Sequence, residues 1–233
     1  MTKFSSHLMK GLALALVLLP ALSDASEGAK MESAQIDLSD KAALQRGASV
    51  YMSYCSGCHS LSYQRYSRTG QDLGLTQEQV EQNLIFTDAK FGESMVTGLD
   101  ATNATNWLGK APPDLSVVAR TKAEGGDWIY NYLKSFYVDE SRPMGWNNTV
   151  FPGASMPHVL WEMQGMQHPV LEPKRKGPTG EEEPCHQGES QGQCIKGFVS
   201  PDAQKGSMDA EQYDRVARDL SAFLTYVGEP SAV

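Results

Sequence analysis

Apolar and small residues recur at spacings of three and four in the segment that leads to the first pair of cysteines. The positions on this face are Leu44, Gly47, Tyr51 and Tyr54. Ser39 precedes the pattern and Asp40 follows Ser39, which is the composition of a capped helix N-terminus. The pattern predicts an amphipathic helix that Ser39 caps and that ends at Cys55.

Two further helices are predicted in the first two thirds of the chain. Thr76 and Gln79 have the spacing of a capping box, which would start a short helix that runs to about Ile85. A third helix should extend from Asp127 to about Tyr137, because apolar residues recur along one side of it.

The last helix has the clearest pattern. Its apolar stripe runs from Asp209 to Val227 and stops before Gly228 and Pro230, as expected at a helix C-terminus. Residues 87–126 and 138–208 are rich in loop-forming residues, and we find neither a convincing strand pattern nor an internal repeat. The chain is therefore predicted to be mainly α-helical with long loops. Such loops in a compact domain indicate that a large group is buried beneath them.

The N-terminus has the features of an export signal. Lys3 and Lys10 give it a basic start, and the uncharged run Gly11–Ser23 has 13 residues, which is shorter than the roughly 20 needed to span a bilayer. We expect a signal peptide over residues 1–25, cleaved after Ala25, with residues 26–233 as the mature chain. An uncleaved N-terminal anchor is the alternative.

Composition narrows the class of protein. The 233 residues carry 28 acidic and 20 basic side chains, a formal net charge of −8, and loss of residues 1–25 would change it to −9. This acidic balance argues against nucleic acid as a partner. A mean hydropathy of −0.39 argues against a polytopic membrane protein. Four cysteines are too few for a disulfide scaffold of this length.

The sequence Cys55-Ser56-Gly57-Cys58-His59 has the C-x-x-C-H spacing of a covalent haem c site. Two thiols three residues apart can each form a thioether with a haem vinyl group, and the next residue brings an imidazole to the iron. A redox-active C-x-x-C would need a βαβ setting, which the pattern lacks. A zinc site shared with Cys185 and Cys194 would leave His59 without a role.

The second axial ligand is open on local sequence alone, since the chain has ten methionines. Met156 is the best candidate, because Pro and Gly in the surrounding FPGASMP keep the backbone irregular, and a loop can bring its sulfur over a haem face. Met95 and Met144 are also in predicted loops. His158 is the rival ligand, and His168 is a weaker one.

Three motifs in a fixed order resemble those of the cytochrome c1 family. They are RG-x-x-x-Y at residues 46–51 before CSGCHSL at 55–61, APPDLS at 111–116 with Arg120, and FPG at 151–153 before Met156-Pro157. The resemblance extends from about residue 36 to Pro230. It implies a mainly α, cytochrome c-type haem domain with long loops and insertions.

The resemblance also implies a ligand set for one covalently attached haem c. His59 and Met156 would be the axial ligands to iron. The other residues that it assigns to the haem are Cys55 and Cys58 as thioether donors, Pro112 and Pro113 as a wall of the ring, and Arg120 beside a propionate.

The implied function is one-electron transfer within a quinol–cytochrome c oxidoreductase (bc1) complex. The haem would accept an electron from the Rieske iron–sulfur protein and pass it to a cytochrome c, with cytochrome b as a further partner. The subunit would perform no substrate chemistry itself. It would lie on the periplasmic side of the inner membrane and associate with that membrane through the complex. The acidic charge could steer a cationic cytochrome c, and the run Glu181–Glu183 is a candidate for that face.

Three features depart from the family pattern. His158 stands where many members have proline. Cys185 and Cys194 lie in a segment from about Gln167 to Ser207 and, after export, are expected to form a disulfide that adds about 2–3 kcal/mol. The family has a C-terminal membrane anchor, which would begin where this sequence stops, at Val233. Alternative functions are a free periplasmic electron carrier, the haem subunit of another dehydrogenase, and a non-redox exported binding module.

Overall fold

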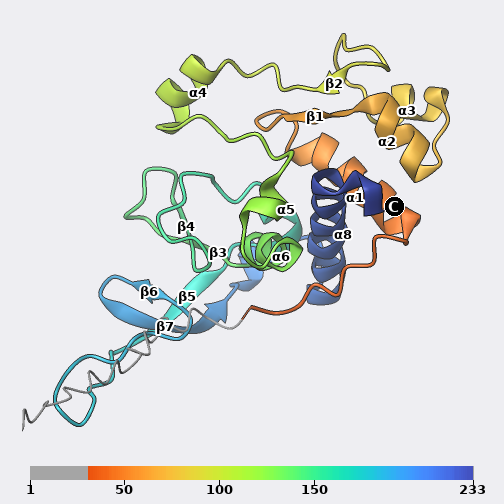
Figure 1. The fold of residues 1–233 in the computed structure, drawn as a ribbon. Coiled ribbons are helices and arrows are strands. Elements are labelled where there is room, and N and C mark those ends of the chain that lie inside the picture. Colours follow the sequence, from red (N-terminus) through yellow and green to blue (C-terminus); the bar gives the residue numbers. More distant parts are fainter. Residues whose placement is uncertain (1–30, 233) are drawn as a thin grey trace, which may run out of the picture.

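The computed structural model describes residues 31–232, and the predicted signal peptide lies outside the described residues. Within this range the chain forms eight α-helices, seven short β-strands and two 3-10 turns (Figure 1). In chain order these are α1 Lys41–Tyr54, β1 Leu61–Arg65, α2 Tyr66–Leu73, α3 Gln77–Asn83, β2 Ser94–Met95, α4 Ala101–Leu108, α5 Val118–Thr121, α6 Gly126–Lys134, β3 Phe136–Val138, β4 Trp146–Asn148, α7 Trp161–Gln164, β5 His168–Glu172, β6 Glu189–Ser190, β7 Gln193–Val199, η1 Asp202–Gln204, α8 Ala210–Gly228 and η2 Pro230–Ala232.

The first helix lies where the periodicity predicts it, with a different cap. Asp40, not Ser39, is the N-cap of α1, because its carboxylate accepts a hydrogen bond from the Ala43 N–H at 3.0 Å. The Ser39 hydroxyl instead donates to Asp37 at 2.6 Å. The predicted face is buried at Leu44, Gly47 and Tyr51, whereas Tyr54 is exposed.

For the other predicted helices, the agreement between predicted and observed ends varies. Both α3 and α8 begin with a capping box, at Thr76 and Asp209. Helix α6 is shorter than predicted, because it ends at Lys134 and the chain continues as strand β3. Phe136 and Tyr137 belong to that strand, where aromatic side chains pack well on a pleated surface.

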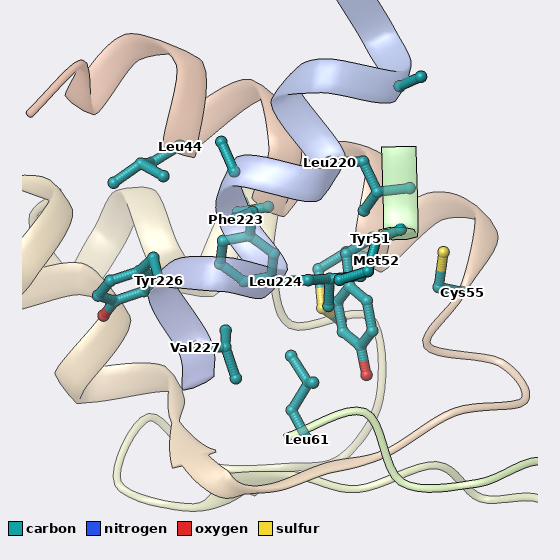
Figure 2. Packing of buried hydrophobic residues seen from close by; sticks show 14 of the residues in the cluster. Leu44, Tyr51, Met52, Cys55, Leu61, Leu220, Phe223, Leu224, Tyr226 and Val227 are labelled. Atoms are coloured by element: carbon teal, nitrogen blue, oxygen red, sulfur yellow. The ribbon is translucent and has the colours of Figure 1, made fainter. Parts of the chain in front are cut away.

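Helices α1 and α8 pack against each other and form the centre of the molecule, with α6 beside them (Figure 1). The contact is close at Gly47, where an added Cβ would lie 2.1 Å from the carbonyl oxygen of Asp219. Arg46 donates to the Asp219 carboxylate at 2.6 and 3.1 Å and ties the same turns together. Figure 2 shows the apolar cluster between the helices, which includes Leu44, Tyr51, Leu220, Phe223 and Tyr226.

The expectation of a chain without strands is wrong. Strands β1 and β2 pair, β3 pairs with β4, and β5, β7 and β6 form a three-stranded sheet, all antiparallel. These strands have two to seven residues, which is too short to give a clear alternating pattern. Helices α2, α4 and α5 were also missed. The mainly α class is therefore confirmed only in part. No helix within residues 31–232 is both long and apolar enough to cross a bilayer.

Strands β5 and β7 belong to an arm that extends from the helical body (Figure 1). Cys185 and Cys194 form a disulfide in this arm, with 5.1 Å between their Cα atoms, which confirms the predicted pairing. Toward the tip, Lys174 pairs with Glu182 at 3.2 Å and with Glu189 at 2.8 Å. The basic run at residues 174–176 and the acidic run at residues 181–183 therefore face each other.

Candidate haem site

The two cysteines of the C-x-x-C-H sequence lie where α1 ends. The Cys58 N–H and the His59 N–H both donate to the carbonyl oxygen of Cys55, at 3.0 and 2.8 Å. The thiols and the imidazole therefore follow one another within a single tight turn. Cys55 is buried at the edge of the core cluster (Figure 2). Cys58 is exposed.

The ring of His59 is held by one of its two nitrogens. Its Nδ1 lies 2.7 Å from the carbonyl oxygen of Pro113. Because a carbonyl can only accept, Nδ1 carries the proton and Nε2 keeps its lone pair. The backbone of the same residue is also fixed, since the Tyr51 hydroxyl donates to the carbonyl oxygen of His59 at 2.6 Å. The tautomer with the proton on Nδ1 is the one that a histidine needs to coordinate iron through Nε2.

Pro113 lies beside the imidazole, because its segment is hydrogen-bonded to the chain that follows His59. The Leu115 N–H donates to the carbonyl oxygen of Ser60 at 2.9 Å. The Ser62 N–H donates to the Asp114 carboxylate at 2.9 Å. Pro112 and Pro113 immediately precede these contacts, so the motif at residues 111–116 and the haem motif form one unit.

The protonation states in this unit follow from burial. Burial, with a smaller contribution from the neighbouring Cys58, raises the pKa of the Cys55 thiol to about 12. Burial also lowers the pKa of His59, although the hydrogen bond to Pro113 and the charge of Asp114 act in the opposite direction. The imidazole is thus neutral at physiological pH, as a metal ligand must be.

Met156 lies in a separate group of residues, against α6. Its Sδ accepts from the Tyr132 hydroxyl at 3.6 Å, and its side chain is half-buried. Tyr132 stacks on Trp128 with ring centres 4.9 Å apart and meets Phe136 edge-on at the same distance. These three aromatic residues recur every four positions. The spacing is visible in the sequence, where it is equally typical of one side of a helix.

His158, the rival ligand, is packed into the protein. Its side chain is 2% exposed and stacks parallel to Phe136, with 5.1 Å between ring centres. Burial lowers its pKa to about 4, although the nearby Gln164 side chain acts in the opposite direction. The ring is therefore neutral and supports the backbone two residues after Met156. His168, the weaker rival, bonds Gln204 instead.

A buried asparagine that the sequence analysis missed shapes the loop before Met156. Asn148 is fully buried, and its Oδ1 accepts from the Ser135 hydroxyl and from the N–H groups of Val150 and Phe151 at 2.9 to 3.0 Å. Its Nδ2 donates to the carbonyl oxygen of Tyr132 at 2.8 Å. One side chain thus links the loop to α6. No local pattern marks such a residue.

Arg120 is oriented toward the end of α8. Its guanidinium pairs with Glu229 at 3.1 Å, and both side chains are at least half exposed. A surface pair of this kind contributes roughly 0–1 kcal/mol, so it leaves the guanidinium available for another anion. Lys122, two residues further on, places its ammonium 4.0 Å from the centre of the Trp128 ring, within the aromatic group around Met156.

The four-cysteine zinc site is wrong, because Cys185 and Cys194 are joined to each other. In the part of the chain that the structure describes, no three His, Cys, Asp or Glu side chains are grouped as ligands for a metal ion. The chemical role of the C-x-x-C-H unit therefore does not involve Cys185 and Cys194.

Comparison with known proteins decides the family. The model of the Cytochrome C1 family matches residues 32–94, which include the haem motif and the helix before it. Cytochrome c1 of Allochromatium vinosum is 45% identical over 220 residues, covering 94% of this chain and 84% of the relative. The chain belongs to the cytochrome c1 family.

Two further relatives extend the comparison. The ammonia monooxygenase gamma subunit of Nitrosomonas europaea is 38% identical over 227 residues, covering 97% of this chain and 86% of that protein. The mitochondrial cytochrome c1 heme protein of Schizosaccharomyces pombe is 30% identical over 138 residues, half of this chain and 45% of the relative.

Proteins of the cytochrome c1 family carry one covalently bound haem c. The residues present fit this group. Cys55 and Cys58 lie within one turn, and the hydrogen bond from Nδ1 of His59 leaves Nε2 free to coordinate. Membership of this family also makes the chain a haem-bearing electron-transfer protein of the bc1 type, associated with a membrane through its complex.

Proposed function

We propose that this protein accepts an electron from a Rieske iron–sulfur protein and passes it to a cytochrome c, in a complex with cytochrome b on the periplasmic side of the inner membrane. The observation that carries the proposal is the 2.7 Å contact between Nδ1 of His59 and Pro113, since it prepares Nε2 as a ligand beside two thiols. Signal-directed export would bring the chain to that side of the membrane.

The axial ligands of the haem in this proposal are His59 and Met156. Bound haem c supplies reversible one-electron chemistry at its iron. His59 would hold its imidazole in place through Pro113, and Met156 would present a thioether, which favours ferrous iron and a high reduction potential. The Tyr132 hydroxyl supports this role for Met156, because its bond to Sδ at 3.6 Å restricts the side chain.

The remaining site residues act around the ring in this proposal. Cys55 and Cys58 would form the thioethers, and Pro112 and Pro113 would cover one edge and exclude water. Arg120 would approach a propionate, exchanging its exposed partner Glu229 for the new anion. This exchange costs little, because the existing pair is solvated on both sides.

Replacement of methionines tests the ligand assignment. The full chain, produced in a host with haem-attachment machinery, should give a haem c pyridine haemochrome spectrum. Met156→Leu should remove the near-infrared sulfur-to-iron charge-transfer band and lower the reduction potential sharply. Met144→Leu is the matched control in a neighbouring loop and should change neither. Retention of the band in Met156→Leu would place the sulfur ligand elsewhere.

Co-purification tests the partners. Extraction of native membranes should recover this chain together with a cytochrome b and a Rieske protein. Recovery of the full-length native protein in the soluble fraction alone would instead support a free electron carrier. Recovery with the subunits of another oxidoreductase would support the alternative that the chain is the haem subunit of another dehydrogenase.

A further inference from the structure

We propose that Asp114 is a positioning residue for the haem ligand: its carboxylate clamps the Pro113 carbonyl against His59 and so fixes the orientation of the imidazole. The proposal rests on the axial role of His59 proposed above. It assigns a role to a residue that the motif comparison left without one.

The need for a clamp follows from the hydrogen-bond partner of His59. The acceptor is a backbone carbonyl 54 positions along the chain. It lies on a segment that belongs to no helix or strand, and Pro113 itself has no N–H with which to anchor this backbone. Another contact must therefore hold the Pro113 carbonyl in place. The hydrogen bonds of the next residue, Asp114, supply this constraint.

The Asp114 carboxylate uses both oxygens to connect the two segments. Its Oδ2 accepts from the N–H of Ser62 at 2.9 Å, three residues after His59. Its Oδ1 accepts from the N–H of Ser116 at 2.7 Å and closes a local turn. One side chain therefore fixes the shape of its own segment and joins that segment to the start of β1.

Two neighbouring contacts strengthen the same link. The Leu115 N–H donates to the carbonyl oxygen of Ser60 at 2.9 Å, and the Tyr63 N–H donates to the buried Ser116 hydroxyl at 3.1 Å. Partial burial would raise the pKa of Asp114, but the hydrogen bonds from Ser116 and Ser62 outweigh it and hold the pKa below its usual value. The clamp is therefore charged at physiological pH and accepts as a carboxylate.

The consequence for the haem follows from the hydrogen bond between Nδ1 of His59 and the Pro113 carbonyl. A hydrogen bond from Nδ1 makes the imidazole a stronger donor to the metal and fixes the ring plane. A stronger donor favours ferric iron. Loosening the clamp should therefore weaken the bond from Nδ1, raise the reduction potential and let the imidazole reorient.

Three variants of the full-length holoprotein test the role. Asp114→Asn keeps one acceptor oxygen and removes the charge. Asp114→Ser keeps an acceptor for the local turn to Ser116 but is too short for the bond from Ser62. Asp209→Asn is the matched control, because it removes an equal charge from a carboxylate that accepts a backbone N–H at the far end of α8.

The decisive readout is the His59 Nδ1–H itself, measured by nuclear magnetic resonance in the diamagnetic ferrous protein. Both Asp114 variants should accelerate its exchange with solvent by about tenfold or more, and the control should not. The principal g values of the ferric haem should also change. The ferrous-to-ferric ratio at the wild-type midpoint should rise by about threefold, about 28 mV at 59 mV per tenfold.

Two patterns would overturn the proposal. The first is an Asp114 variant that binds haem and shows the wild-type exchange rate and g values. A shifted potential in that variant would not rescue the proposal, because loss of charge alone can move the potential. Unchanged exchange in Asp114→Ser would show that the bond from Ser62 is dispensable. A different failure concerns His59: if His59→Ala kept the wild-type low-spin spectrum, the axial assignment would be wrong whatever the Asp114 variants did.

Discussion

A single buried amide determines the shape of the loop that presents Met156. Asn148 accepts three hydrogen bonds and donates one, and every partner is in α6, in the turn after it or in the loop itself. An aliphatic side chain of similar size could fill the volume but could not satisfy these partners. Asn148 therefore stabilises the fold mainly through its hydrogen bonds, because leaving buried donors unpaired costs free energy.

Asn148→Ala should lower the free energy of unfolding by about 1–3 kcal/mol. It should also weaken the near-infrared sulfur-to-iron band, because the Met156 loop becomes mobile. Urea denaturation and absorbance of the ferric holoprotein measure the two effects. The control is Asn103→Ala on the exposed face of α4, which should change stability by no more than about 0.5 kcal/mol. Equal denaturation midpoints for both variants would contradict the role of Asn148.

The roles of individual residues show where sequence reasoning stops. The C-x-x-C-H unit is local, so its spacing alone predicted the chemistry at Cys55, Cys58 and His59. The partners that orient these residues are distant: Pro113 lies 54 positions from His59, and Asp114 lies 52 positions from Ser62. No single-sequence pattern connects such pairs. They had to come from the folded structure.

At the scale of elements, the haem motif is positioned by the crossing of α1 and α8. The two helices are in close contact at Gly47, and Arg46, one residue earlier on α1, pairs with Asp219 of α8. The C-terminal end of α1 leads directly into Cys55. A change in the separation of these helices should therefore reach the haem as well as the core.

Gly47→Ala should lower the free energy of unfolding by about 1–3 kcal/mol, because its Cβ would lie 2.1 Å from a backbone oxygen of α8 and 2.7 Å from the Cβ of Phe223. Chemical denaturation measures the cost, and the visible spectrum reports displacement of the haem. Gly92→Ala is the control, since no atom lies within 4 Å of its added Cβ. A Gly47→Ala protein as stable as this control would rule out close helix contact.

The disulfide belongs to the arm and not to the helical core. Cys185 and Cys194 close a loop with a sequence separation of 9, and the arm contacts the body near β3. With Cys55 and Cys58 in thioethers, a thiol assay on the unfolded, unreduced holoprotein should detect no free thiol. Reduction of the disulfide in the folded, ferrous holoprotein should expose two thiols and leave the ferrous haem spectrum unchanged. Two free thiols before reduction would contradict the pairing.

Prediction succeeded at this scale where a periodic pattern is long or where a capping box marks the start of a helix, as at Thr76 of the seven-residue α3. Helix α8 has 19 residues and α1 has 14, so each completes several turns and its periodicity is clear. Strand β2 has two residues, and α2 and α4 have eight each. In these short elements packing and cross-strand pairing decide the structure, and neither is visible in the sequence.

For the whole molecule, the important quantity is the distribution of charge. The chain carries 28 acidic and 20 basic residues, so its long-range field is negative. The acidic run at 181–183 contributes little to that field, because Lys174 pairs with Glu182 and the exposed Arg175 and Lys176 lie on the facing side of the hairpin. Steering of a cationic partner should therefore come from acidic residues spread over the molecule.

The rate of electron transfer to a cationic cytochrome c should fall about tenfold or more between 0.01 and 0.15 M salt, because the Debye length shortens from about 30 to about 8 Å. Stopped-flow mixing of the reduced holoprotein with the acceptor measures it. The anionic oxidant hexacyanoferrate(III) is the control, and its rate should rise with salt. Glu181, Glu182 and Glu183 changed together to glutamine should leave the salt dependence almost as steep. Loss of the salt dependence in this triple variant would instead locate the docking surface at the tip of the arm.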